Sequence, residues 1–355
     1  MTKLQANVVD SIDAVNENQW DNVVAQSECG TIFQQSGWLR AIERALDRTP
    51  RHVVIRKNGN PVAVLPNFVS DIALPVDLPV DASAVGATQL SSVTPGFGGP
   101  LIMGKKDRVL GALRQTLERV HREGSVFHRM RILDSNHVQY AQTLRKWGYR
   151  PSLLYCRFAL ELDDYDRILA DMDKERRKEI RDAKEIEYEV ESEEIDRETM
   201  RSFHDEYLKT MSHVDGSPFP VAFFEQLGDH LADQIQIFTA YVEGAEAGQH
   251  LYLRDDNRDA LHYFFAGVDE EYFRYSSPTL LHDHALRWGI ENGYERFDFG
   301  STNANYANGT FNYKQKFGAE LEPIYEWEKG TAPIRWPVYR SARTLYRRHS
   351  DTLEK

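Results

Sequence analysis

The stretch YSSPTLLHDHALRWGIENGYERFDFGSTNANYANGTFNYKQKFGAEL, residues 275–321, decides the fold of this chain. It opens with a Ser-Pro step and continues as an apolar-periodic helix to Gly293, a residue type that commonly ends a helix as a left-handed cap. The strand RFDFG follows at residues 296–300. Residues 234–268 supply three β-rich runs joined by EGAEAG and RDDNRD, which predicts an antiparallel meander. Meander, helix and strand together predict a mixed α/β unit.

Upstream of the meander, the sequence predicts mainly helices. Residues 164–185 read as one charged helix with a basic cluster, and a second helix is expected at about 196–212. The loop SHVDGSPFP, residues 212–220, separates this helix from a third.

The first half of the chain predicts a similar mixture of elements. Asn58-Gly59 lies between two β-rich runs, and this dipeptide favours a tight hairpin turn. Residues 70–100, rich in Pro, Gly, Ser and Ala, predict a long loop. The other expected elements are a helix from Ser36, a helix over about 107–123, a strand around 127–133, a helix over 136–147 and a strand over 153–162.

The length of 355 residues predicts two domains, because one hydrophobic core rarely fills so long a chain. We place the first over residues 1–163 and the second over 164–355. Hydrophobic residues make up 41% and charged residues 28%, the balance of an ordinary globular protein.

The charge balance argues against broad nucleic-acid binding. The net charge is −12, whereas phosphate binding needs clustered cations. Arginine (30) exceeds lysine (13), and with the acidic excess this composition is typical of a salt-adapted, halophilic proteome. The basic, aromatic segment IRWPVYRSARTLYRRH, residues 334–349, is the exception: it is either a solvated helix packed on the first domain or a weak contact with a membrane surface or tRNA.

Other site classes lack their signatures. The sequence contains no P-loop, no G-x-S-x-G elbow and no H-E-x-x-H, so it offers no nucleophilic or metal centre. Cys29 and Cys156 are far apart, which predicts buried thiols and no disulfide framework. The N-terminus resembles no signal peptide and no apolar run reaches membrane-spanning length, so we expect a cytoplasmic protein.

The separated motifs resemble the FemAB-type and BioF2-like members of the GNAT (N-acetyltransferase) superfamily. The family pattern has a Ser-Pro, a helix ending in Gly, a Phe-Asp-Phe-Gly strand, a Gly-containing loop and Phe-x-x-Lys-x-x-Phe-Gly. Here these stand as Ser277-Pro278, Gly293, residues 297–300, Gly309, and Phe311, Lys314, Phe317 and Gly318. The resemblance also takes in FQQSGWL, the hairpin ending in AVLP, and the helix with RRKEIRDAKE.

The resemblance implies an α/β (α+β) fold: a tandem of GNAT-like acyl-CoA N-acyltransferase domains, with two mixed, antiparallel-rich sheets flanked by helices. It implies that residues from about 320 pack back on the first domain. It also implies acyl transfer to an amine, with acyl-CoA as co-substrate, or with aminoacyl-tRNA as in members that extend cell-wall peptides. We expect no tightly bound cofactor.

The donor site is expected at the start of the helix near residue 277. The chain departs from the wider superfamily here, because FRYSSPTLL stands where R-x-x-G-x-G usually holds a pyrophosphate. A helix N-terminus still binds anions, and we assign Arg274, Ser276 and Ser277 to this site. The resemblance adds Lys314 as a donor- or substrate-contacting cation; its alternative is a surface lysine whose stem covers Phe311 and Phe317.

Three residues are candidates for proton handling. Asp298 points opposite to its aromatic neighbours and either orients the amine or pairs with an arginine and caps the next loop. His213, with Asp215, lies in the predicted loop and is a candidate general base. Tyr207, one turn earlier, is a candidate hydrogen-bonding partner of the substrate.

Four further residues are candidates for substrate binding. Arg177 and Arg181 share one helix face at a spacing suited to a phosphate or carboxylate, with pairing to nearby acids as the alternative. Tyr263 and Tyr275 are candidates whose alternative is packing.

The sequence therefore predicts an N-acyltransferase acting on the amine of a small molecule, sugar or peptide by direct attack, without a metal. The first rival is aminoacyl-tRNA-dependent transfer to a cell-envelope precursor. The second is a binding module that has kept the fold without catalysis, because fold alone does not specify chemistry. Asp298 in a structural ion pair would favour this second rival.

Overall fold

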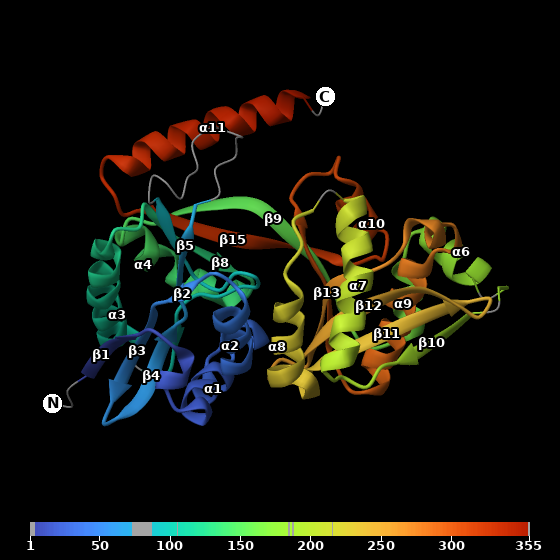
Figure 1. Ribbon diagram of the computed structural model, residues 1–355, viewed down its shortest axis with the longest axis horizontal. Coiled ribbons are helices and arrows are strands. Elements are labelled where there is room, and N and C mark those ends of the chain that lie inside the picture. The colour runs from blue at the N-terminus through green and yellow to red at the C-terminus, as the bar shows by residue number, and fades with distance from the viewer. Residues whose placement is uncertain are drawn as a thin grey trace. The chain divides into compact units, whose positions relative to one another are not determined.

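The computed structural model describes residues 4–72, 87–104, 106–183, 185–186, 188–214 and 216–353, with side chains as far as residue 345. The chain forms two compact units (Figure 1). Unit 1 comprises Met1–Glu43, Asp47–Ser152 and Tyr325–Lys355, and unit 2 comprises Arg44–Leu46 and Leu153–Ile324. Residues 73–86, within the loop predicted over 70–100, lie outside the described residues, as does Asp215.

Unit 1 combines short strands with helices. Its predicted hairpin is confirmed: Asn58 and Gly59 have φ of 54° and 85°, as a tight turn with two left-handed residues requires. The elements of this unit are β1 (Leu4–Val9), α1 (Glu17–Gln26), α2 (Ser36–Ala45), β2 (Thr49–Pro50), β3 (His52–Lys57), β4 (Asn60–Leu65), β5 (Phe68–Asp71), β6 (Thr88–Ser91), β7 (Leu101–Ile102), α3 (Lys106–Val120), β8 (Phe127–Ile132), α4 (Ala141–Lys146), the end of β15 (Glu320–Gly330) and α11 (Arg335–Leu353).

The strands of unit 1 follow two orders, β1-β3-β4-β7 and β15-β8-β6-β5-β2. Most pairs are antiparallel, but β6 and β8 run parallel, and α3 lies between them in the chain. Trp20, Phe33 and Trp38 are fully buried in the core of this unit. Both cysteines of the chain are buried thiols, as expected.

Helix α11 packs on unit 1 through one face. The Phe127 ring of β8 stacks on Tyr339 at 5.1 Å between centroids, and Trp336 lies 5.3 Å from it. Arg343 donates to both oxygens of Glu328 at 2.7 and 2.6 Å. A Cβ on Gly330 would approach Trp336 to 2.0 Å, so only glycine fits there. Within the described residues, no helix has the length and apolarity needed to cross a bilayer.

Unit 2 repeats the same plan with longer strands, in the order β10-β11-β12-β13-β14-β9. The predicted meander is confirmed as β11, β12 and β13, and β13 then pairs parallel with β14, with α9 between them in the chain. The elements are β9 (Arg150–Glu161), α5 (Tyr165–Asp171), α6 (Lys174–Ala183), β10 (Tyr188–Ser192), α7 (Arg197–His213), α8 (Val221–Leu231), β11 (Ile235–Val242), β12 (Ala245–Asp255), β13 (Ala260–Gly267), α9 (Ser277–Glu291), β14 (Arg296–Asn303), α10 (Gly309–Gln315) and the start of β15.

Two local expectations in unit 2 are wrong. Residues 164–185 are not one helix, because Met172 is extended (ψ 151°) and Asp173 begins a new helix by accepting the Glu175 N–H at 2.8 Å. The loop expected from residue 212 starts later, because α7 runs through His213 and Val214 closes it onto Thr210.

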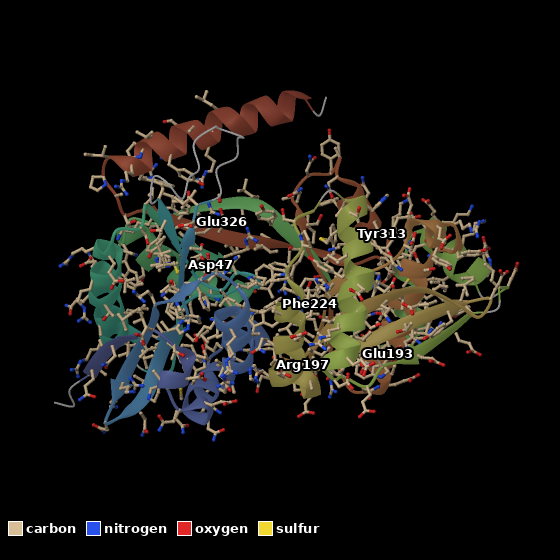
Figure 2. The ribbon with its side chains drawn as sticks, viewed as in Figure 1. Asp47, Glu193, Arg197, Phe224, Tyr313 and Glu326 are labelled. Carbon is tan, nitrogen blue, oxygen red and sulfur yellow. The ribbon has the colours of Figure 1, made fainter. Side chains whose placement is uncertain are left out.

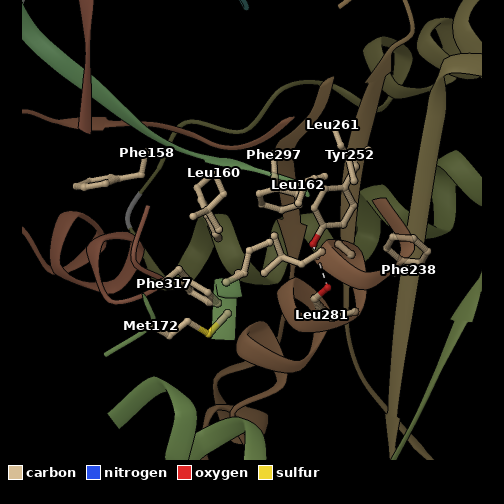
Figure 3. Packing of buried hydrophobic residues seen from close by; sticks show 14 of the residues in the cluster. Phe158, Leu160, Leu162, Met172, Phe238, Tyr252, Leu261, Leu281, Phe297 and Phe317 are labelled. Atoms are coloured by element: carbon tan, nitrogen blue, oxygen red, sulfur yellow. Dashed lines mark hydrogen bonds between the residues drawn. The ribbon is translucent and has the colours of Figure 1, made fainter. Parts of the chain in front are cut away.

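The main core of unit 2 lies between the sheet and helices α5, α6 and α9 (Figure 3). Phe297 and Phe317 are fully buried in it, and the Tyr252 hydroxyl reaches the Leu281 carbonyl at 3.3 Å. A second aromatic group joins α7 and α8 to β13, with Phe224 (labelled in Figure 2) 5.0 Å from the ring of Phe265. Helices therefore cover this sheet on both faces, and the mixed α/β fold class is confirmed.

Candidate functional site

The parallel strands β13 and β14 separate next to the motif that decides the fold. Three residue pairs join them, from Ala260↔Arg296 to His262↔Asp298. Beyond that point β14 shifts its register against β9, between Asp298 and Ser301. Side chains and carbonyl groups of β13, β14 and α10 meet where the strands part.

Asp298 is held at this point by three hydrogen bonds. Its Oδ2 accepts from Arg157 Nη1 at 2.7 Å and from His262 Nδ1 at 3.1 Å, and its Oδ1 accepts the Gly300 N–H at 2.8 Å. Burial alone would raise the pKa of Asp298, but Arg157 and His262 outweigh it and hold that pKa well below its usual range. Both oxygens of this ionised carboxylate are occupied. These are the contacts of the arginine-pairing and loop-capping alternative, and they leave Asp298 poorly placed to take a proton from an amine.

Further charged side chains lie on both sides of Asp298, beyond His262 and beyond Arg157. His262 Nε2 lies 3.8 Å from Asp255 Oδ2, and Arg157 Nη2 lies 2.7 Å from Glu322 Oε2. Burial would lower the pKa of His262, yet the nearby carboxylates of Asp255 and Asp298 raise it above the ordinary value. Sequence reasoning missed Arg157, although one arginine inside the apolar run LLYCRFALEL signals a buried ion pair.

Lys314 is buried, and no carboxylate of the described residues pairs with it. Its Nζ donates to the carbonyls of Gly300 and Ser301, both at 3.1 Å. An ammonium group has three N–H donors, and within the described residues the third has no protein acceptor. Burial lowers the pKa of Lys314 to about 8, against the opposing effects of Asp298 and Cys156. Lys314 is thus a buried cation with one donor to spare, and not a surface lysine.

Glycine at position 300 is required for this arrangement. Its φ is +74°, and a Cβ would lie 2.7 Å from the Tyr263 carbonyl oxygen. The Gly300 carbonyl is one of the two acceptors that hold Lys314.

We expect Gly300→Ala to cost about 1–2 kcal/mol for the left-handed backbone alone, with a further cost for the contact with Tyr263. The free energy of unfolding, from urea denaturation, measures the sum. Gly293→Ala is the matched control, because Gly293 has φ of +79° and nothing within 4 Å of its Cβ position. Equal losses in the two variants would show that the close approach to Tyr263 is unimportant.

The start of α9 is a weaker anion site than a glycine-rich turn. Ser276 precedes the helix in the left-handed conformation (φ 58°), and the Ser277 hydroxyl donates to the Tyr272 carbonyl at 3.2 Å. Of the first amides, Pro278 has none, and the Thr279 N–H donates to the Ser276 carbonyl at 2.8 Å. Most of the donors that a pyrophosphate would need are therefore used or missing.

Arg274 and Tyr275 lie in the turn before α9. The exposed Arg274 guanidinium lies 4.7 Å from the centroid of the Tyr275 ring. This pair lies on the chain next to Ser276, so two of the predicted donor-site residues, Arg274 and Ser276, stay together, whereas Ser277 is buried and used internally.

The predicted arginine pair does not form. Arg177 donates to the carbonyls of Ala170 and Met172 at 2.6 and 2.7 Å, which closes the end of α5. Arg181 is exposed, and its Nε lies 3.9 Å from Asp182.

The buried arginine of this helix is instead Arg176. It donates to Glu179 and to the Thr279 hydroxyl, and its guanidinium lies 4.3 Å from the ring of Tyr313 (Figure 2). Arg176 thereby joins α6, α9 and α10 just behind Lys314. The run of charges in RRKEIRDAKE gives no signal for which arginine is buried.

The two predicted residues of α7 have local partners. The Tyr207 hydroxyl accepts the Phe219 N–H at 3.2 Å, and burial raises the pKa of this phenol. His213 lies in the last turn of α7, half-exposed, with Nδ1 3.2 Å from Glu270. Among the residues that the structure describes, their polar partners are thus Phe219 and Glu270, and not Asp298 or Lys314.

Tyr263 lies where the parallel strands β13 and β14 separate, next to His262. Its ring lies 4.7 Å from that of His250 and 4.6 Å from that of His282, and Lys314 Nζ lies 5.7 Å from its centroid. Burial keeps both histidines neutral: it lowers the pKa of His250 to about 3 and that of His282 well below its usual range. Of the predicted residues, Asp298, Lys314 and Tyr263 therefore meet at one place.

Comparison with known proteins gives three kinds of match: to a family model, to a protein sequence and to solved structures. Residues 170–315 match the family described as an acetyltransferase (GNAT) domain. Aminoacyltransferase FemB of Staphylococcus epidermidis is 26% identical over 73 residues, which is 19% of this chain and 18% of FemB. The match thus spans less than a fifth of that relative's length.

Solved structures extend the likeness of fold over nearly the whole chain. FemX has a TM-score of 0.69 at 13% identity, over 92% of this chain and 98% of FemX. A tandem GNAT protein from the clavulanic acid biosynthesis pathway has a TM-score of 0.54 at 15% identity, over 93% of this chain and 99% of its own. The chain thus contains a stretch that matches a GNAT domain, is similar to FemB over a short segment and shares the fold of FemX.

Proposed function

We propose that this protein transfers an activated acyl group to an amine and that Lys314 stabilises the oxyanion of the transition state. The observation that carries the proposal is the third N–H of Lys314, a donor in a buried setting where the strands of the GNAT domain part. A fixed donor in a site shielded from water stabilises developing negative charge far more than one in solvent.

The reaction needs no covalent enzyme intermediate. The neutral amine attacks the acyl carbonyl carbon, and the carbonyl electrons move to the oxygen. Lys314 donates a hydrogen bond to this oxyanion. The intermediate then collapses, the new amide bond remains, and the leaving thiolate or alkoxide departs. Because Arg157 and His262 hold the pKa of Asp298 well below its usual range, the proton lost by the amine passes to the leaving group or to water. Positioning and electrostatics supply the rate.

Acyl-CoA is the first donor to test, with an amine of a small molecule, sugar or peptide as acceptor. Aminoacyl-tRNA is the second candidate, and the start of α9 favours it: Pro278 and the bonded Thr279 amide leave few donors for the pyrophosphate of coenzyme A. FemB, an aminoacyltransferase, suggests a cell-envelope peptide as acceptor in that case.

Calorimetric titration with acetyl-CoA, a long-chain acyl-CoA and free CoA separates the two donors. We expect saturable binding of an acyl-CoA that weakens in Lys314→Met, followed by release of free CoA when amines are added. No binding by folded protein overturns the CoA donor, and loss of the aminoacyl group from aminoacyl-tRNA in the presence of an amine then supports the second candidate. If neither donor is consumed, the proposal fails and the non-catalytic binding module replaces it.

A further inference from the structure

The last helix of the chain is basic and lies within an acidic protein. Residues 329–350 contain five arginines and no Asp or Glu, whereas the whole chain carries a net charge of −12. At physiological ionic strength, charges more than about 8 Å apart are largely screened, so the local charge of α11 decides what it attracts. Among the described side chains, Arg335 and Arg340 are exposed cations, whereas Arg343 is paired with Glu328.

In the part of unit 1 that the structure describes, the recorded packing of α11 involves one of its faces. Trp336, Tyr339 and Arg343, at i, i+3 and i+7, lie against Phe127 and Glu328. These contacts fix the rotation of the helix about its axis and therefore decide which residues face outward.

The outward face carries large apolar side chains. Ile334, Val338 and Leu345 are 82%, 68% and 67% exposed. Val338 and Leu345 are seven residues apart on α11, so they lie on one side of the helix, opposite to the packed residues, and Ile334 lies in the turn just before the helix. Leu345 also borders an open hollow of about 440 Å³, whose other lining residues are Pro337, Arg340, Ser341 and Thr344. Arg335 and Arg340 are exposed as well: by helical spacing Arg335 adjoins the apolar residues, and Arg340 lies nearer to the packed face.

We propose that this outer face of α11 docks on an anionic lipid surface, with Ile334, Val338 and Leu345 entering the interface and the arginines meeting lipid phosphates. A helix that lies in a bilayer interface combines these two features. Nucleic acid would use the arginines but has no place for three exposed aliphatic side chains beside them. The apolar row thus favours lipid over tRNA, and the inference does not depend on the proposed reaction.

Sedimentation with vesicles tests the proposal on the full chain. We expect the protein to sediment with vesicles of equimolar phosphatidylglycerol and phosphatidylcholine, to sediment far less with phosphatidylcholine alone, and to be released by salt. Arg335→Gln with Arg340→Gln should lower the partition coefficient by on the order of ten- to thirtyfold, because each basic residue near an anionic surface contributes about 1 kcal/mol.

A second variant tests the apolar residues Ile334, Val338 and Leu345, and Val138→Asn is its control. Changing Ile334, Val338 and Leu345 together to Asn should lower binding by about tenfold or more, while circular dichroism and melting stay unchanged because all three are exposed. Val138→Asn, which removes a 52% exposed side chain elsewhere in unit 1, should bind as the wild type does.

Three outcomes overturn the proposal. Binding that is equal on neutral and anionic vesicles, or unchanged in the triple variant, removes the lipid face. Binding of tRNA that depends on the arginines but not on the apolar residues assigns the face to nucleic acid. A concentration-dependent dimer that the triple variant abolishes assigns it to a second copy of the chain.

Discussion

Lys314→Met should lower the acyl-transfer rate by about 10²- to 10³-fold, the usual cost of removing one oxyanion donor. Methionine keeps much of the length and apolar stem of lysine, so the buried space between β14 and α10 stays filled. The loss should appear in kcat, because the interaction strengthens only as charge develops on the substrate oxygen. Steady-state kinetics with the donor identified by calorimetry measure it.

Lys316→Met is the matched control for this variant. It removes the same charge two residues later, but Lys316 is partly exposed and pairs with Glu175, so activity should stay within about twofold of the wild type. Equal losses in both variants would show that Lys314 acts only through net charge.

The pH profile gives a separate check on Lys314. Its pKa of about 8 means that the donor loses its charge as the pH rises through 8, so the wild-type rate should fall there and the variant should lack this fall. Stability should change in the opposite direction. The unfolded chain, with a lysine pKa near 10.5, binds more protons between about pH 8 and 10.5, and this lysine therefore makes the folded state relatively more stable as pH rises across that window. Lys314→Met should abolish both effects.

Arg157→Met should destabilise the protein by about 3–5 kcal/mol, because it leaves the buried Asp298 carboxylate without its guanidinium partner. Asp298 is 1% exposed, so water cannot replace the guanidinium. Urea denaturation of the wild type and the variant, analysed with a common dependence of the free energy of unfolding on urea concentration, gives the difference in that free energy.

Arg296→Met is the corresponding control. Arg296 pairs at 2.6 Å with Glu322, which also binds Arg157. A third of the Arg296 side chain is exposed, so its replacement should lower the free energy of unfolding by no more than about 1 kcal/mol. The double variant Arg157→Met, Asp298→Asn should recover part of the loss, because it removes the buried charge as well. If Arg157→Met lowers the free energy of unfolding no more than Arg296→Met does, the buried Arg157–Asp298 pair does not stabilise the fold.

Most elements of the fold were predictable from local patterns. The Asn58-Gly59 turn, the meander of residues 234–268 and the helix that ends before Gly293 depend on turn chemistry and on apolar periodicity, which act over a few residues. The break at Met172 was missed because Asp173 begins a new helix inside a run of charges that reads as continuous. The end of α7 was misplaced for a similar reason, since a polar stretch gives no periodicity to follow.

The candidate site was only partly predictable. Asp298 and Lys314 stood out by motif, yet their settings did not: one is held by Arg157 and His262, and the other by two backbone carbonyls. These partners come from strands and helices far apart along the chain, and no short pattern encodes them. The same holds for Arg176, which is indistinguishable in sequence from its neighbour Arg177.

The sequence by itself determined the family resemblance, the order of helices and strands and the glycines that the turns require, because these depend on neighbouring residues. Tertiary structure alone decided which charged groups became buried, which partners they found and how their pKa values moved, because desolvation and pairing depend on distance in space. It also decided which face of α11 packs on Phe127 and which stays exposed, since helical spacing offers both faces and only the docking of Trp336 and Tyr339 selects one.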